Sequence, residues 1–427
     1  MNRAIVKAFP VVVLAVFCTI VVPAYAQDEL PPALEAHLDG LVTITEAVRQ
    51  LDTLTPVERA FPTREETVAY LTDLYSQAYP QDELDRVNAF YSALGLLPEG
   101  TNLLDVYLTL LGSQVAGFYD TDTQVMNVLP AGFSGEESLS LTEQIIFVHE
   151  YVHALQDQHF DLDVLLEGAS ADDNFDRALA LTALVEGDAS IAMNFYSQQI
   201  AIQNPLSALL LVAESFQAGN LILPEGIPAS LVRELIFPYE SGLTFALAVF
   251  AEGGWDALNA AYTPENQPQT TEQILHPEKY FAGEGADPSN LPAFDIAGAL
   301  EGYAVLYDTA LGEFYLREHL RSGLPASEAN RAAAGWGADR FQLLQNNAGE
   351  SAFMLAVSFD TQADQDEFQA AYQAMLDETA AVTPEDAACW NRESAFVCLT
   401  EGDWYTAVFT APTLQAAQAL RAAGDVT

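Results

Sequence analysis

The chain has 427 residues, with 61 Asp and Glu against 15 Lys and Arg and a formal net charge of −46 at pH 7. Such a surface repels nucleic-acid phosphates and anionic lipid headgroups, so nucleic-acid binding is excluded as the main role. The length exceeds that of one ordinary domain, and two or three packed units are expected.

The first 26 residues have the pattern of a secretory signal peptide. Arg3 and Lys7 give a basic start, residues 8–22 are almost wholly apolar, and Ala24–Ala26 forms an A-x-A cleavage site. A retained membrane anchor is the alternative, but the apolar run is short for a membrane span and contains Pro10. We therefore expect cleavage after Ala26, a secreted or cell-envelope protein, and no stable membrane insertion of the mature chain.

Residues 27–110 are predicted to be helical. Apolar residues recur at three- and four-residue intervals in 41–54, 64–79 and 82–96. We find no site chemistry here. Two roles stay open for this region, a helical cap on a catalytic unit and a pro-region-like cover.

Two short runs of strand-like residues follow, at 115–120 and 124–129, joined by the turn-rich segment Asp120–Thr123. They predict a β-hairpin. An extended peptide can pair with the free edge of such a hairpin, so a peptide-binding role is one interpretation. An ordinary structural hairpin is the other.

The segment 143–160 carries the strongest chemical signal in the chain. Its apolar residues recur at helical spacing, and it contains an H-E-x-x-H motif that begins at His149 and ends at His153. Residues four apart lie on one helix face, so the two imidazoles can bind one metal ion. Glu150 points elsewhere around the helix and can serve as a general base. The motif predicts a catalytic zinc site.

A third ligand is expected because catalytic zinc usually has three protein ligands and one open position. Glu186 is a carboxylate within the apolar helical run 177–190, and a buried acid requires a metal or another partner. His159 is the rival, because its spacing from His153 fits an extended H-E-x-x-H-x-x-G-x-x-H pattern. That pattern needs a glycine where this chain has Gln156, so Glu186 is preferred.

His149, Glu150 and His153, followed by Glu186 on a later helix, resemble the gluzincin type of zincin metallopeptidases over roughly residues 110–290. The resemblance implies a mainly helical core with a small β-sheet and one Zn²⁺ per chain that activates water for peptide hydrolysis. In the best-known members, an Asp placed at a helical interval after the Glu ligand braces a His ligand. This chain has Asp188 only two residues after Glu186, so the resemblance does not assign that role.

Three further phrases are similar to a group of uncharacterised exported bacterial zincin-like proteins. They are 154–158, 185–189 and 271–280. This likeness implies a fold and a metal but no substrate.

Peptide hydrolysis also needs a donor that stabilises the oxyanion of the intermediate. Tyr239, His276 and Tyr280 are the candidates, each with a polar tip, and we favour Tyr239 and His276. Local packing or helix capping is the alternative role for His276. His37 and His319 are expected at the surface and are assigned no role.

The last part of the chain predicts a small α/β sandwich in residues 349–427. It should contain a strand, a helix, a hairpin and a final helix, at 353–359, 362–378, 394–399 with 404–410, and 414–423. Cys389 and Cys398 are the only cysteines after the signal peptide, and an exported protein favours a disulfide between them over a metal pair. Residues 291–348, including 334–340, are predicted as a helical connector.

Together these features predict an α+β protein. Its expected parts are a signal peptide at 1–26, a helical region at 27–110, a mainly helical zincin-like core at 111–290, the connector and the sandwich. The expected function is exported, zinc-dependent hydrolysis of a peptide or protein, with Glu150 as the general base. The alternatives are a non-catalytic zincin-fold envelope protein with a structural metal and a metal-dependent amidase that acts on cell-wall peptides.

Overall fold

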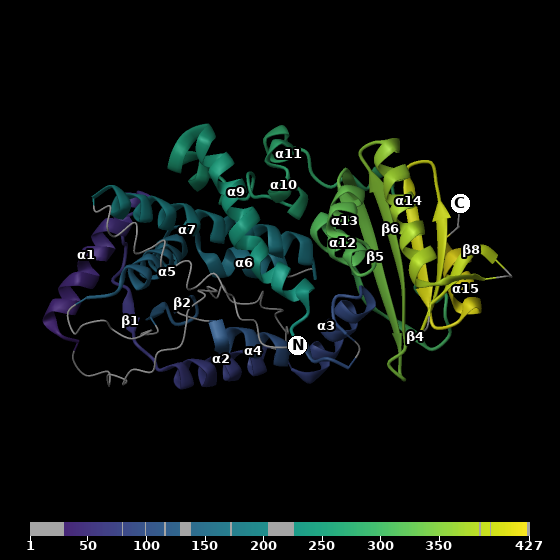
Figure 1. Ribbon diagram of the computed structural model, residues 1–427, viewed down its shortest axis with the longest axis horizontal. Coiled ribbons are helices and arrows are strands. Elements are labelled where there is room, and N and C mark those ends of the chain that lie inside the picture. Colours follow the sequence, from purple (N-terminus) through teal and green to yellow (C-terminus); the bar gives the residue numbers. More distant parts are fainter. Residues whose placement is uncertain are drawn as a thin grey trace. The chain divides into compact units, whose positions relative to one another are not determined.

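The computed structural model describes residues 30–78, 80–98, 100–114, 117–128, 138–170, 173–203, 226–383, 386–392 and 394–424. The predicted signal peptide lies outside the described residues. The described chain combines helices with two separate sheets, so the predicted α+β class is confirmed (Figure 1). The contacts between residues divide the chain into two compact units whose segments alternate along the sequence.

Unit 1 consists of the described residues within Met1–Pro80, Leu104–Ala169 and Leu181–Gln267. Its elements are α1 (Pro32–Arg49), β1 (Glu58–Ala60), α2 (Arg64–Ala78), α4 (Leu103–Gln114), β2 (Gly117–Asp120), β3 (Val125–Val128), α5 (Leu141–Phe160), α6 (Leu162–Ser170), α7 (Phe175–Gln203) and α9 (Ala229–Ala260). The predicted hairpin is confirmed, because β2 and β3 pair antiparallel. β1 adds to β3 in parallel, which leaves β2 at one edge of the sheet.

The core of unit 1 forms around α5. Leu38 and Leu41 of α1, Met126 of β3, and Phe147 and Leu155 of α5 belong to one buried apolar cluster. The N-terminal helix predicted at 41–54 is found, but it begins earlier and ends at Arg49, with Pro32 at its first turn. Proline is suited to that position because the first N–H groups of a helix have no intrahelical acceptor.

Helix α9 is, among the described helices, the one whose length and composition would allow it to cross a membrane. The core helix of a soluble protein can pass the same test, so this is weak evidence. Two features interrupt its regularity. Pro238 lies within it, and the backbone leaves helical geometry at Gly253 and Gly254.

Unit 2 consists of the described residues within Gln81–Leu103, Ser170–Ala180 and Pro268–Thr427. Its elements are α3 (Gln81–Ala93), α10 (Thr271–Leu275), α11 (Pro277–Ala282), the 3₁₀ turn η1 (Pro288–Asn290), β4 (Tyr303–Thr309), α12 (Gly312–Arg321), α13 (Ala326–Ala333), β5 (Trp336–Asn346), β6 (Ser351–Phe359), α14 (Gln362–Thr379), β7 (Ala381–Thr383), β8 (Asp386–Asn391), β9 (Phe396–Glu401), β10 (Tyr405–Ala411) and α15 (Leu414–Gly424).

A seven-stranded antiparallel sheet organises unit 2, in the order β4-β5-β6-β10-β9-β8-β7. Successive side chains of a strand point to opposite faces. Met354 of β6 accordingly belongs to the apolar cluster that includes Leu420 of α15, whereas Phe359 stacks against Phe368 of α14. Helices therefore cover both faces of the sheet.

The predictions for the C-terminal elements are largely confirmed. β6, α14, the β9–β10 hairpin and α15 occur where expected. Cys389 and Cys398 form a disulfide between β8 and β9 and are cross-strand neighbours.

The helix predicted through 334–340 is wrong, since these residues enter β5, which pairs with β4 and β6. The connector predicted at 291–348 therefore supplies two strands of the sheet. Polar side chains within β5 obscured its strand character in the sequence. Asp339 accepts hydrogen bonds from the backbone N–H groups of Leu311 and Gly312, and Arg340 pairs with Asp308.

The surface location predicted for His319 is also wrong, because its side chain is buried. Its Nδ1 contacts the carbonyl of Leu94 at 2.9 Å, and its Nε2 contacts the hydroxyl of Tyr372 at 2.9 Å. These partners are distant in sequence, so the sequence carried no local signal for them.

Candidate metal centre

Helix α5 carries the H-E-x-x-H motif and has a well-defined cap at each end. Ser140 caps its first turn, with a reciprocal pair of hydrogen bonds to Glu143, and Asp161 ends it in a left-handed conformation. The capping box satisfies backbone donors that a helix leaves open at its start. The motif lies in the fully buried middle of the helix.

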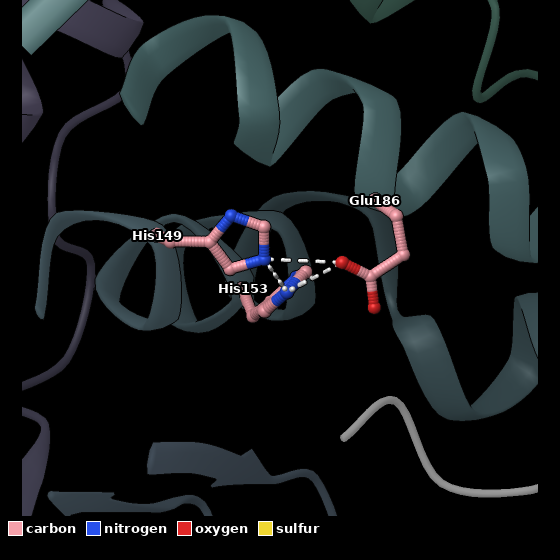
Figure 2. A group of neighbouring side chains, drawn as sticks. All are labelled: His149, His153 and Glu186. Atoms are coloured by element: carbon pink, nitrogen blue, oxygen red, sulfur yellow. Dashed lines mark hydrogen bonds and ion pairs between the residues drawn. The ribbon is translucent and has the colours of Figure 1, made fainter. Parts of the chain in front are cut away.

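Three of the predicted residues converge, and Figure 2 shows their arrangement. His149 and His153 extend from α5 toward Glu186 on α7. His149 Nε2 lies 3.0 Å from Glu186 Oε2 and 3.1 Å from His153 Nε2. His153 Nε2 lies 3.5 Å from the same carboxylate oxygen. All three residues are 1% exposed, and they form the one three-residue group suited to a metal ion in the described parts of the chain.

These distances fit a zinc ion. Tetrahedral zinc with ligand bonds of about 2.0–2.1 Å separates neighbouring ligand atoms by roughly 3.3 Å. The three separations observed here are close to that value. A bound cation could also be shared by the two imidazole nitrogens, whose Nε2 atoms lie 3.1 Å apart in this buried site. The donor set of two His and one carboxylate is therefore compatible with Zn²⁺.

The charges of the group depend on one another. Burial raises the pKa of Glu186, but the neighbouring His153 and His149 outweigh burial and hold it at about 2. Burial lowers the pKa of His149. For His153, burial is outweighed by the negative charge of Glu186, and the pKa rises to about 9. Glu186 is therefore the anion that attracts a proton or a metal cation to this position.

Glu150 lies beside the group without belonging to it. Its Oε2 accepts a hydrogen bond of 3.1 Å from the backbone N–H of Tyr119 on β2. Its Oε1 is buried and has no hydrogen-bond partner among the described residues. Burial raises the pKa of Glu150 to about 8, a value near neutrality that suits a group that accepts and returns protons.

A close crossing of α7 and α9 positions Tyr239. A Cβ atom placed on Gly187 would lie 2.1 Å from the carbonyl oxygen of Gly242, so only glycine permits this approach. Tyr239, one turn before Gly242 on α9, donates a hydrogen bond of 3.1 Å to Glu186 Oε1. The structure thus brings Tyr239 into contact with Glu186.

Gln156 also belongs to this site and was missed in the sequence, where it served only as evidence against His159. It is fully buried, and its Oε1 accepts a hydrogen bond of 2.8 Å from His153 Nδ1. This contact holds a proton on Nδ1, so that when the ring is neutral its lone pair is on Nε2, the nitrogen that faces His149 and Glu186. The sequence signal for this contact is the spacing of Gln156 from His153, because residues three apart lie on the same helix face.

The remaining candidates lie elsewhere. His159 contacts the backbone carbonyl of Asp52 through Nε2 and does not belong to the metal group, in agreement with the preference for Glu186. His276 and Tyr280 belong to unit 2. His276 lies 3.1 Å from Glu313 through Nε2, and this contact is the main cause of its raised pKa. The oxyanion role of His276 stays a prediction.

A family model described as "Domain of unknown function (DUF8575)" matches residues 295–421, which run from just before β4 into α15 of unit 2. No curated protein and no solved structure matches the chain. The matched domain does not include His149, His153 or Glu186, so the chemistry of this group has to be inferred from its own residues.

Proposed function

We propose that the chain is an exported zinc-dependent peptidase of the zincin type, with one zinc ion per chain held by His149, His153 and Glu186. The observation that carries the proposal is the convergence of these three buried ligand atoms beside a fourth buried residue, Glu150, whose Oε1 has no partner among the described residues. A purely structural metal site does not require Glu150. Hydrolysis does, because a water nucleophile needs a proton acceptor.

The proposed mechanism assigns one role to each residue. When bound, the zinc ion would polarise the scissile carbonyl and lower the pKa of a water molecule. Glu150 would accept a proton from the water whose oxygen bonds to the scissile carbonyl carbon, and would return it to the amine nitrogen as the C–N bond breaks. Tyr239 holds the second oxygen of Glu186, so that the carboxylate presents Oε2 to the cation.

The substrate is expected to be an extended peptide. β2 lies at one edge of its sheet, and the N–H of Tyr119 on β2 is bonded to Glu150. A peptide that pairs with this strand would therefore lie beside the general base. The edge position of β2 is the reason for proposing a peptide or protein as the substrate.

The burial of all three ligands supports a second candidate, a non-catalytic protein with a structural metal. Structural zinc sites are closed, whereas catalytic ones keep a position open to water. The two functions differ in what they require of Glu150.

The test is cleavage of a mixed peptide library, followed by mass spectrometry, with the mature protein and its Glu150→Gln variant. We expect the wild type to cut and the variant to lose about 10²–10⁴-fold in rate, the usual contribution of a general base. Both proteins should bind about one zinc ion per chain by elemental analysis. Glu240→Gln, an exposed acid on α9, is the matched control and should cut like the wild type.

Three results would reject the peptidase. Equal cleavage by wild type and Glu150→Gln would remove the general base from the mechanism. Zinc binding by both proteins without cleavage by either would favour the structural metal. Absence of zinc from the wild type would reject both candidates.

A further inference from the structure

The last residue of α1, Arg49, is fully buried in unit 1. Its Nε lies 2.7 Å from Asp188 Oδ1 and its Nη2 donates to Asp188 Oδ2 at 2.9 Å, so the guanidinium binds the carboxylate through two nitrogens. Nη2 also donates to Asn259, and the guanidinium lies 4.5 Å from the centre of the Trp255 ring. The buried guanidinium cation is thus in contact with a carboxylate, an amide oxygen and an aromatic ring.

The carboxylate of Asp188 is shared with other buried groups. Its Oδ2 accepts hydrogen bonds from Gln156 Nε2 at 3.0 Å and from the hydroxyl of Tyr262 at 2.8 Å. Asp188 is on α7, two residues after the proposed ligand Glu186. Gln156 is on α5, three residues after the proposed ligand His153. Asp188 therefore connects both ligand-bearing helices to α1.

These contacts fix the orientation of the Gln156 amide. Its Nε2 donates to the carbonyl of Val185 as well as to Asp188. A flipped amide would place its oxygen against a carbonyl and a carboxylate, which is unfavourable in a buried site. Oε1 is consequently held toward Nδ1 of His153, so Nδ1 keeps its proton and Nε2 is the nitrogen that would give up its proton to bind a metal.

A stability role alone explains this arrangement poorly. Replacing a buried ion pair by apolar residues of similar volume is often neutral or stabilising. The chain has only 15 basic residues, and one of them is fully buried here. A role in positioning a metal ligand gives the buried charge a function, because the partners that orient a ligating His tune metal affinity.

We propose that Arg49, Asp188 and Gln156 form a positioning relay that fixes His153 as a metal ligand, and that α1 is therefore an integral part of the metal centre. The inference rests on the proposed metal site. For α1, it favours a permanent helical cap over a pro-region-like cover, the two roles left open for the N-terminal helices. A removable cover would activate the protein when cut away, whereas loss of α1 should weaken metal binding.

The experiment measures zinc affinity by competition with a chelator in Gln156→Met and Arg49→Met. Each variant should bind zinc about 10–100-fold more weakly than the wild type, the usual effect of removing such a partner. The visible spectrum of the Co²⁺-substituted protein should change as well, because the ligand geometry changes. Both variants should keep the wild-type secondary structure by circular dichroism.

Two matched controls separate the relay from general effects. Gln158→Met removes side-chain hydrogen bonds between α5 and the segment after α1, at Leu54 and Thr55. Arg59→Met removes a partly exposed ion pair with Asp39. Neither residue contacts the metal group, so zinc affinity and the Co²⁺ spectrum should stay unchanged in both.

The double variant Arg49→Met with Gln156→Met tests the connection between the two residues. In a relay, Arg49 acts through Gln156, so the double variant should bind zinc no more weakly than Gln156→Met alone. Additive losses would overturn the relay. If Arg49→Met does not fold, Gln156→Met decides, because it leaves the Arg49–Asp188 pair in place.

The outcomes also separate this inference from the proposed function. Wild-type zinc affinity and an unchanged Co²⁺ spectrum in Gln156→Met would overturn the relay and leave the metal site standing. A wild type that binds no zinc would reject the metal site itself.

Discussion

The buried histidines of the two units differ in what their ring nitrogens contact. In unit 1, the Nε2 atoms of His149 and His153 approach each other and one carboxylate oxygen of Glu186. In unit 2, His319 has one partner for each nitrogen, the carbonyl of Leu94 and the hydroxyl of Tyr372. Burial lowers the pKa of His319 to about 4, so its ring is neutral, with one donor and one acceptor both in use.

Burial alone therefore does not identify a functional histidine. His319 is buried and satisfied, which is the arrangement of a structural residue. In unit 1, three potential ligand atoms, the Nε2 atoms of His149 and His153 and one oxygen of Glu186, lie within 3.5 Å of one another. A single cation could bind all three, whereas no such group of ligand atoms surrounds His319 among the described residues.

The buried carboxylates of the two units show the same contrast. Glu186 has two imidazole neighbours, which hold its pKa at about 2. Asp176 of unit 2 is fully buried and is bonded to the backbone N–H and the hydroxyl of Thr271. Burial raises the pKa of Asp176 to about 8, despite these donors. One acid is kept as an anion that attracts a cation, and the other is kept neutral at mild pH.

The largest expected effect on zinc affinity comes from replacing a histidine of unit 1, with a histidine of unit 2 as the comparison. His149→Gln should weaken zinc binding by more than about a hundredfold. This exceeds the loss expected when a residue that only hydrogen-bonds to a ligand is removed. His319→Leu should leave zinc affinity unchanged and lower the free energy of unfolding by about 1–3 kcal/mol, because the Leu94 carbonyl loses its partner. Chelator competition and denaturant unfolding measure the two quantities.

Loss of zinc affinity in His319→Leu, with the fold intact, would break the distinction between the two histidine environments. A wild-type affinity in His149→Gln would remove this residue from the metal site.

A smaller effect is expected from the helix crossing that holds Glu186. Gly187→Ala places a Cβ 2.1 Å from the backbone of Gly242, so α7 and α9 must separate at a cost of about 1–3 kcal/mol or more. The contact between Tyr239 and Glu186 should be lost with it, and zinc affinity should fall. Urea unfolding and chelator competition on the same samples test both statements.

Gly168→Ala is the matched control for this prediction. Gly168 is exposed on α6 and has nothing within 4 Å of an added Cβ. Alanine there should stabilise the protein by about 0.5–1 kcal/mol. Equal destabilisation by both variants would contradict the proposed importance of the crossing.

The sequence was sufficient for residues whose role is visible locally. The H-E-x-x-H motif lies on a helix as predicted, and Glu186, an acid that stands out in an apolar helical run, lies beside its two histidines. The β9–β10 hairpin was predicted from its own alternating pattern. In each case the signal lies within a few residues.

Residues that act through distant contacts were missed. Arg49 pairs with Asp188, 139 positions away in the sequence, and the helical periodicity of α1 gives no hint of that partner. The strand β5 was mistaken for helix because Asp339 and Arg340 made it look polar, and their partners become known only in the folded chain. Local pattern thus predicts the candidate ligands, whereas the long-range contacts of Arg49 and of β5 are found only in the tertiary structure.

The last prediction tests the carboxylate half of the comparison through pH. The pKa of Asp176 in the folded protein is about 8, above its ordinary value of 3.8. The folded state therefore keeps a proton that the unfolded state loses, and the stabilisation is lost as the pH rises through 8. Asp176→Asn should weaken the decline of melting temperature between pH 5 and pH 8, since the amide oxygen still accepts from Thr271.

Asp287→Asn is the control for this measurement. Asp287 is exposed, and its hydrogen bonds to Ser289 lower its pKa below 3.8, so it does not titrate in this range. The control should show the wild-type decline, and Asp176→Asn should bind about one proton fewer in the folded state. Identical declines in all three proteins would mean that Asp176 is ionised in the folded state. In that case both buried acids would be anions. They would differ only in their neighbours, because Glu186 lies beside two imidazoles and Asp176 beside Thr271.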